Sequence, residues 1–225
     1  MKNIIENKVE KKNRLLFTTE PKYFLIAIAF SLVACKPAEP PAPYSYNPNP
    51  VFTWGYPDFF GNYYSHYGIQ NNVVSLNLFT EKLVVNTENK LEGTGQYLIL
   101  EDIFSAKTDT LLPAGSYRIA DTGDPFTFYG GKKFDDNRNV IPSGAYIYYI
   151  EADASKSKIA YVTDGIFSVS VSTDGIYTIQ CDFTLDEKTK MTGTFKSELS
   201  HFDRTTLSLS RSQMQKIKFA IEFAD

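Results

Sequence analysis

The chain has 225 residues, with 23 basic and 26 acidic side chains and a formal net charge of −3 at neutral pH. This mildly acidic balance argues against nucleic acid as a partner, because the phosphate backbone is bound by clustered lysine and arginine. Its 15 tyrosines and 17 phenylalanines are typical of a protein that is rich in β-sheet.

An apolar stretch near the N-terminus, Tyr23–Ala34, follows a segment that contains six lysines and arginines. The stretch is long enough for the core of a secretory signal, but too short to span a bilayer of about 30 Å. It ends in the run Leu32-Val33-Ala34-Cys35, in which small residues lead directly to a cysteine. We therefore expect residues 1–34 to be a signal peptide. An uncleaved membrane anchor and an ordinary secretory signal are the alternatives.

The run Leu32–Cys35 resembles the lipobox of bacterial lipoproteins. In that family the cysteine thiol receives a diacylglyceryl group, and cleavage makes this cysteine the first residue. The resemblance implies that Cys35 carries fatty-acyl chains such as palmitate and anchors the protein to a membrane. Lys36 stands where an aspartate would favour the inner membrane of enteric bacteria, so the implied location is the outer membrane, facing the periplasm or the surface. Lipidation leaves Cys181 as the single thiol, so no disulfide forms within the chain.

A proline-rich segment follows the cysteine. Residues 36–50 contain six prolines and few bulky apolar side chains. Because proline fixes φ and lacks an N–H donor, we expect residues 35–50 to form an extended tether, with a rise of about 3.1 Å per residue. Residues 51–225 are then expected to form a single β domain.

The remainder of the chain shows the spacing of short strands. Residues 96–104 and 145–151 are apolar at both odd and even positions, which is typical of strands covered on both faces. Residues 176–185 and 217–223 alternate apolar and polar side chains, as strands with one solvated face do. Turns are indicated by Asp164-Gly165, by residues 173–175 and by residues 186–189.

This pattern predicts an all-β fold, an antiparallel β-sandwich of about 9–11 strands, with a closed β-barrel as the alternative. The strands apolar on both faces favour the sandwich, because each sheet of a sandwich is flanked by another layer.

Four short segments resemble a recurring pattern in Bacteroides-type envelope lipoproteins, an all-β family without an established active site. They are Gly95–Leu100, Ser105–Lys107, Leu112–Tyr117 and Asp121–Asp124. The resemblance covers roughly residues 60–200. It implies an all-β fold in the cell envelope and identifies no catalytic residue.

Two neighbouring acids, Glu101 and Asp102, interrupt an otherwise apolar strand. Adjacent residues of a strand face opposite sides, so at least one carboxylate should approach the interior, where burial raises its pKa or a partner must neutralise it. Such a carboxylate would serve as a general acid or as a ligand-binding group. A structural pair, or a strand that leaves its sheet at this point, is the simpler alternative.

Aromatic residues are concentrated in residues 52–67, which include the only tryptophan, Trp54. Exposed flat rings stack on sugar faces, so Trp54, Tyr56 and Tyr63 could form a glycan-binding platform. The alternative is that these rings fill the core of the fold.

The sequence offers no strong signal for a metal, a cofactor or a nucleophile. Residues 135–139 place oxygen ligands at alternate positions, but Val140 and Tyr146 stand where a calcium loop needs glycine and glutamate. His66 and His201 have no metal-binding spacing. Cys181 lies on the apolar face of its strand and is expected to be an inert core thiol.

These observations favour a non-catalytic binding or structural module, anchored in the outer envelope, with a glycan, a peptide or an envelope protein as its partner. One alternative is a hydrolase on the same fold, which needs two carboxylates about 5–10 Å apart in one cleft. Another is an assembly component whose edge strand, residues 217–223, pairs with a partner chain.

Overall fold

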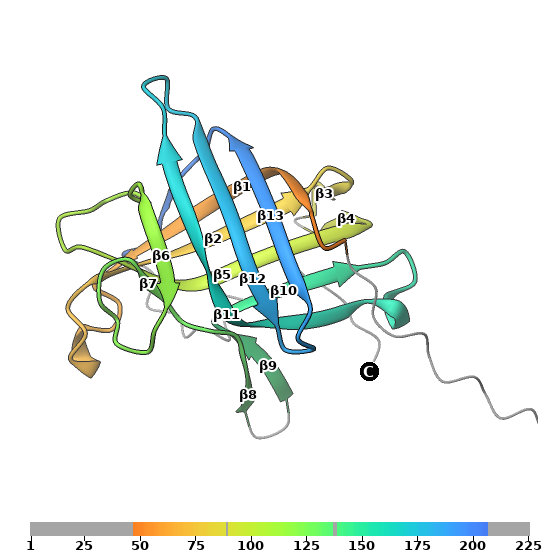
Figure 1. Ribbon diagram of the computed structural model, residues 1–225, viewed down its shortest axis with the longest axis horizontal. Helices are drawn as coiled ribbons and strands as arrows, with labels where there is room; N and C mark the ends of the chain where they lie inside the picture. The colour runs from red at the N-terminus through yellow and green to blue at the C-terminus, as the bar shows by residue number, and fades with distance from the viewer. Residues whose placement is uncertain (1–46, 89, 137–138, 207–225) are drawn as a thin grey trace, which may run out of the picture. The chain divides into compact units, whose positions relative to one another are not determined.

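The computed structural model describes residues 47–88, 90–136 and 139–206 (Figure 1). Within these ranges the fold is all-β, with two single-turn 3₁₀ helices, and no helix has the length and apolarity needed to cross a membrane. The strands are β1 (Val51–Gly61), β2 (Asn72–Thr80), β3 (Leu83–Val85), β4 (Leu91–Gly93), β5 (Gly95–Ser105), β6 (Gly115–Ile119), β7 (Thr127–Phe128), β8 (Lys132–Asp136), β9 (Asn139–Ser143), β10 (Ala145–Ile150), β11 (Lys158–Val171), β12 (Tyr177–Leu185), β13 (Lys190–Ser197) and β14 (Phe202–Asp203); the helices are η1 (Ser65–Tyr67) and η2 (Ala154–Lys156).

Most of these strands belong to one sheet, which closes into a mixed barrel of eight strands. β1, β2 and β5 pair antiparallel in that order, as do β11, β12 and β13. β13 returns to β1 through a short parallel pairing, and β14 continues alongside β1 in the same direction. The space between β5 and β11 is bridged by β10 at one end and by β7 and β6 at the other. In Figure 1, β11–β13 cross in front of β1, β2 and β5.

The predicted sandwich is not found, whereas its alternative, a closed barrel, is confirmed. β5 and β10 are indeed covered on both faces over most of their length. One face is buried in the barrel interior, and the other is buried on the outside of the barrel. A strand that is apolar on both faces therefore does not require a second sheet.

The barrel interior is filled by apolar side chains. An eight-stranded barrel is just wide enough for its inward-facing side chains to fill it. Tyr117 and Phe167 stack there with ring centroids 4.5 Å apart, and Phe128 contacts Phe167 edge-on. Cys181 is buried in this core, as predicted, and burial raises the pKa of its thiol to about 12.

Two of the three predicted turns are found. Residues 173–175 connect β11 to β12, and residues 186–189 connect β12 to β13. The turn predicted at Asp164-Gly165 is wrong: β11 runs through this dipeptide, and the register shifts between Val162 and Asp164. Gly165 has a φ of +127°, a conformation that suits glycine at an irregularity inside a strand.

The last residues of the predicted tether are bound to the barrel. The carbonyl oxygen of Pro48 accepts a hydrogen bond from the Thr192 N–H (2.7 Å), and that of Pro50 accepts one from the Thr194 N–H (3.0 Å). The predicted signal peptide, Cys35, the first part of the tether and the predicted strand 217–223 lie outside the described residues.

Candidate binding surface on the outside of the barrel

A second cluster of buried side chains lies on the outside of β1, β2, β5, β10 and the first part of β11. Its members alternate with residues of the barrel core: Phe79 and Tyr97 point outward, whereas their neighbours Leu78 and Leu98 point inward. We call this face the aromatic wall. Its members are Trp54, Tyr56, Phe79, Tyr97, Ile99, Tyr146, Tyr148, Ile150, Ile159 and Tyr161.

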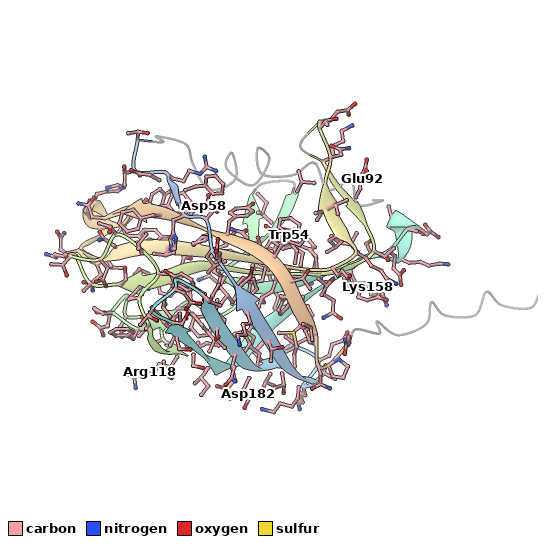
Figure 2. The ribbon with its side chains drawn as sticks, turned by 90° about the horizontal axis from the view of Figure 1, so that it is seen from above. Trp54, Asp58, Glu92, Arg118, Lys158 and Asp182 are labelled. Carbon is pink, nitrogen blue, oxygen red and sulfur yellow. The ribbon has the colours of Figure 1, made fainter. Side chains whose placement is uncertain are left out.

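The opposite side of the barrel has a different outer face. Figure 2 shows Asp182 on the side opposite Trp54 and Asp58. Along β12 and β13 buried side chains alternate with more exposed polar ones. We call this face the polar wall. Its outward residues are Thr178, Gln180, Asp182, Thr184, Lys190, Thr192, Thr194 and Lys196.

Aromatic rings form a continuous stack across four strands of the aromatic wall. The ring of Trp54 on β1 lies parallel to that of Phe79 on β2, with centroids 3.9 Å apart. Phe79 stacks in turn on Tyr97 of β5 at 4.1 Å, and Tyr97 stacks on Tyr148 of β10 at 6.0 Å. The stack follows from register, because these residues occupy neighbouring outward positions on paired strands.

Trp54, Tyr56 and Tyr63 all lie outside the barrel core, so the alternative that they fill the barrel interior is not found. Each ring is partly exposed. Trp54 and Tyr56 belong to the aromatic wall, and Tyr63 lies in the loop after β1, where its ring contacts Phe60 and Tyr64. An irregularity in β1 explains this placement: Phe52 points into the barrel core, and the register with β2 shifts between Phe52 and Trp54, so that Trp54 and Tyr56 point outward although they share the parity of Phe52.

A buried charge network lies among the aromatic residues. The Asp58 carboxylate is fully buried and accepts a hydrogen bond from Nε of Arg204 (2.9 Å). Nδ2 of Asn77 also donates to Asp58 (3.3 Å), and the Tyr97 hydroxyl donates to Oδ1 of Asn77 (2.6 Å). Burial raises the pKa of Tyr97 well above its usual value, so this phenol stays protonated as a donor. Asp58 and Arg204 are far apart in the sequence and carry no local motif that predicts this pair.

Glu101 and Asp102 both face the outside of the barrel. The register between β2 and β5 shifts here, so that Ser75 of β2 stands opposite both acids. This β-bulge adds one residue to β5 and interrupts its strict alternation. The expectation that the two carboxylates lie on opposite faces is therefore wrong, because a bulge is not visible in the pattern of apolar residues.

The Glu101 carboxylate is held at the base of β10. It accepts hydrogen bonds from the Gly144 N–H (3.1 Å) and from the Tyr146 hydroxyl (2.9 Å). Burial and the nearby Glu101 charge raise the pKa of Tyr146 well above its usual value. These bonds connect β5 to the start of β10, at the point where β5 stops pairing with β10.

Asp102 is the more strongly perturbed acid. Its side chain is only 1% exposed, and its Oδ1 accepts a hydrogen bond from the Tyr64 hydroxyl (3.0 Å). Burial raises the pKa of Asp102 to about 8, and the positive charge of Lys132 partly opposes this shift. The ring of Tyr64 also lies near Phe104 and Tyr129, which places Asp102 beneath an aromatic loop. The predicted burial of one carboxylate is thus found, outside the core rather than inside it.

The remaining candidate residues gather in no metal-binding cluster within the described ranges. No three His, Cys, Asp or Glu side chains gather there as a metal site requires. His66 is exposed, whereas His201 is half-buried and its Nε2 accepts a hydrogen bond from the Leu112 N–H (3.2 Å). Of the predicted oxygen ligands at 135–139, Asp135 and Asp136 belong to β8 and Asn139 belongs to β9, and their side chains and residues 137–138 lie outside the described part of the chain.

The chain matches no protein-family model, no curated protein and no solved structure. The resemblance to Bacteroides-type envelope lipoproteins therefore stays a prediction.

Proposed function

We propose that this protein is a lipid-anchored envelope protein whose barrel binds a ligand on its outer surface and catalyses no reaction. The lipid would be attached to Cys35, and the outer membrane would be its location. The packed interior supports a surface site, because bulky side chains such as Phe128, Phe167 and Phe183 occupy the space that a carrier barrel would offer to a ligand.

A row of partly exposed aromatic rings along β1 is the observation that carries this proposal. Trp54 and Tyr56 point outward from β1, and the Tyr56 ring meets that of Phe202 edge-on at 5.5 Å. Phe202 is 44% exposed, and the guanidinium of Arg204 lies 5.3 Å from its ring centroid. Rings that stack on apolar surface, beside a charged hydrogen-bond donor, fit the alternating apolar and hydroxyl surfaces of a glycan. We therefore favour a glycan as the ligand.

Trp54 supplies a direct assay, because it is the only tryptophan and lies in this row. Glycans that the full chain retains on an array should change its tryptophan emission in a saturable titration. Phe202→Ala should weaken this binding severalfold without unfolding the protein. Ile166→Ala is the matched control, since Ile166 is 50% exposed on β11, outside the aromatic wall, and its loss should leave binding unchanged. The proposal fails if no glycan changes the emission, or if the two variants weaken binding equally.

The anchor is tested separately. Mass spectrometry of the mature protein should show a fatty-acylated N-terminal cysteine at position 35, and Cys35→Ser should release the protein from the membrane fraction. An unmodified N-terminus that begins before residue 35 would contradict lipidation.

A hydrolase remains the second candidate, favoured by the raised pKa of Asp102, which suits a general acid. Its 1% exposure favours the structural alternative, because a substrate could reach it only if the loop that carries Tyr64 moved. Asp102→Asn should leave the products of incubation with a bound glycan unchanged. Cleavage by the original protein that this substitution abolishes would favour the hydrolase.

A further inference from the structure

The aromatic wall is buried on its outer face although the described chain supplies only part of a cover. Tyr146, Tyr148 and Tyr161 are 1%, 8% and 7% exposed. Within this cluster, the described residues that do not belong to the barrel strands are Leu83 and Leu91 of the β3–β4 hairpin. An apolar sheet face needs a packed layer along its whole width, so this hairpin alone does not account for the burial.

The hairpin is fixed at the β1 and β2 end of the wall. Nε1 of Trp54 donates a hydrogen bond to the carbonyl oxygen of Leu83 (2.7 Å), and Leu83 is fully buried. The tyrosines of β10 and β11 lie at the other end of the same cluster, two to three strands from β2. The missing layer therefore belongs over β5, β10 and β11.

The C-terminal part of the chain leaves the described residues at the edge of this wall. β14 pairs with the C-terminal half of β1, and the Arg204 N–H donates a hydrogen bond to the carbonyl oxygen of Phe59 (2.8 Å). Thr205 then lies against Gly61, and the description ends at Thr206. Another 19 residues, 207–225, follow from this point in the sequence.

These residues have the composition that the wall requires. Ile217, Phe219, Ile221 and Phe223 share one parity, while charged Lys218 and Glu222 share the other. In extended form this segment has one apolar and one polar face. Seven residues at about 3.3 Å each span roughly 23 Å, which exceeds the roughly 19 Å across five strands that are about 4.8 Å apart.

We propose that residues 207–225 dock on the aromatic wall as an apolar strap, with Ile217, Phe219, Ile221 and Phe223 against the tyrosines. The wall is then the binding face for the C-terminal segment of the same chain. The strap would leave the partly exposed rings along β1, those of Trp54, Tyr56 and Phe202, open to a ligand at the margin of the wall. This inference does not depend on the ligand that the row binds.

Hydroxyl-radical footprinting of the full chain tests the strap, because the radical oxidises aromatic side chains according to their exposure. The double substitution Phe219→Ser and Phe223→Ser should raise the oxidation rates of Tyr146 and Tyr148 severalfold. The matched control, Lys218→Ser and Glu222→Ser, changes the opposite parity and should leave these rates unchanged. Tyr117 in the barrel core reports on unfolding and should stay protected in both variants. Unchanged Tyr146 and Tyr148 rates in the phenylalanine variant would overturn the proposal.

A second measurement keeps the proposal testable if the phenylalanine variant unfolds. A benzoylphenylalanine placed at position 219 replaces one aromatic ring by another and cross-links to whatever it touches on irradiation. We expect cross-links within one chain to peptides that contain residues 95–105, 145–150 or 158–161. Cross-links to the polar wall, or to a second chain, would overturn the strap, and the latter would favour the assembly component instead.

Discussion

The two sides of this barrel share one interior and differ on the outside. β12 alternates strictly between buried and more exposed side chains, whereas β5 is buried at nearly every position. Both strands face the same apolar core, so the difference lies in the burial of their outward faces. The apolar pattern of a barrel strand therefore depends on what lies outside it. Apolar and polar residues alternate where the outer face is in water, and the alternation is lost where the outer face is buried.

The difference also concerns charge. A fully buried carboxylate, Asp58, lies beside the rings of the aromatic wall, whereas the charged residues of the polar wall, such as Asp182, are exposed. A buried charge is costly unless paired and hydrogen-bonded, so each substitution in this network should have a larger effect than its counterpart on the polar wall.

Truncation of an outward-facing ring should give the largest difference in unfolding free energy between the two walls. Phe79→Ala removes a fully buried ring that stacks on both Trp54 and Tyr97, and should lower the free energy of unfolding by about 3–5 kcal/mol. Thr194→Ala, at an exposed outward position of the polar wall, should change it by less than about 0.5 kcal/mol. Urea denaturation of both variants measures the contrast, and equal losses would show that the aromatic wall has no outer layer.

Loss of the cation beside Asp58 should have the next largest effect. Arg204→Met leaves the buried carboxylate without its guanidinium and should cost about 2 kcal/mol of unfolding free energy. The exposed pair of Lys90 and Glu88 is the control, and Lys90→Met should cost less than about 1 kcal/mol. Adding Asp58→Asn to Arg204→Met should recover part of the loss, as a double-mutant cycle would show. Independent, additive effects of these two substitutions would contradict the pairing.

Asp102, on the aromatic side of the barrel, should make the free energy of unfolding depend on pH. Below about pH 4 this carboxyl is protonated in the folded and the unfolded chain, so it does not affect stability there. Between about pH 4 and pH 8 the folded chain retains a proton that the unfolded chain releases, because burial raises the folded pKa to about 8. The free energy of unfolding should therefore fall as pH rises, by up to about 1.4 kcal/mol per pH unit from this group.

Asp102→Asn should remove that contribution, so that the variant gains stability relative to the original protein as pH rises towards 8. Denaturation at several pH values measures this difference. Asp182→Asn on the polar wall, an exposed acid, is the matched control. Parallel stability curves for Asp102→Asn and the original protein would contradict the assigned burial.

The sequence predicted those features that depend on neighbouring residues. The alternation of residues 176–185 predicted β12 and the buried thiol of Cys181, because a strand with one solvated face repeats every two residues. The strands β5 and β10, which are apolar on both faces, were also predicted. The sequence did not predict what covers their outer faces, since a second sheet and an external layer produce the same apolar pattern.

Features set by distant pairing could not be predicted. Closure of the barrel depends on β1 meeting β13, and the buried ion pair joins Asp58 to Arg204, separated by 146 residues. The bulge at Glu101 and Asp102 depends on the register with β2 and turns both acids outward. Trp54 and Tyr56 were identified as candidate residues from composition alone, and their outward direction required the register of β1.

Hydrogen–deuterium exchange on the full chain tests the contrast between the walls most directly. We predict that amides of β5, which is covered on both faces, exchange more slowly than those of β12, which is covered on one. Exchange in β5 that is as fast as, or faster than, exchange in β12 would contradict the presence of a packed layer on the outside of the aromatic wall.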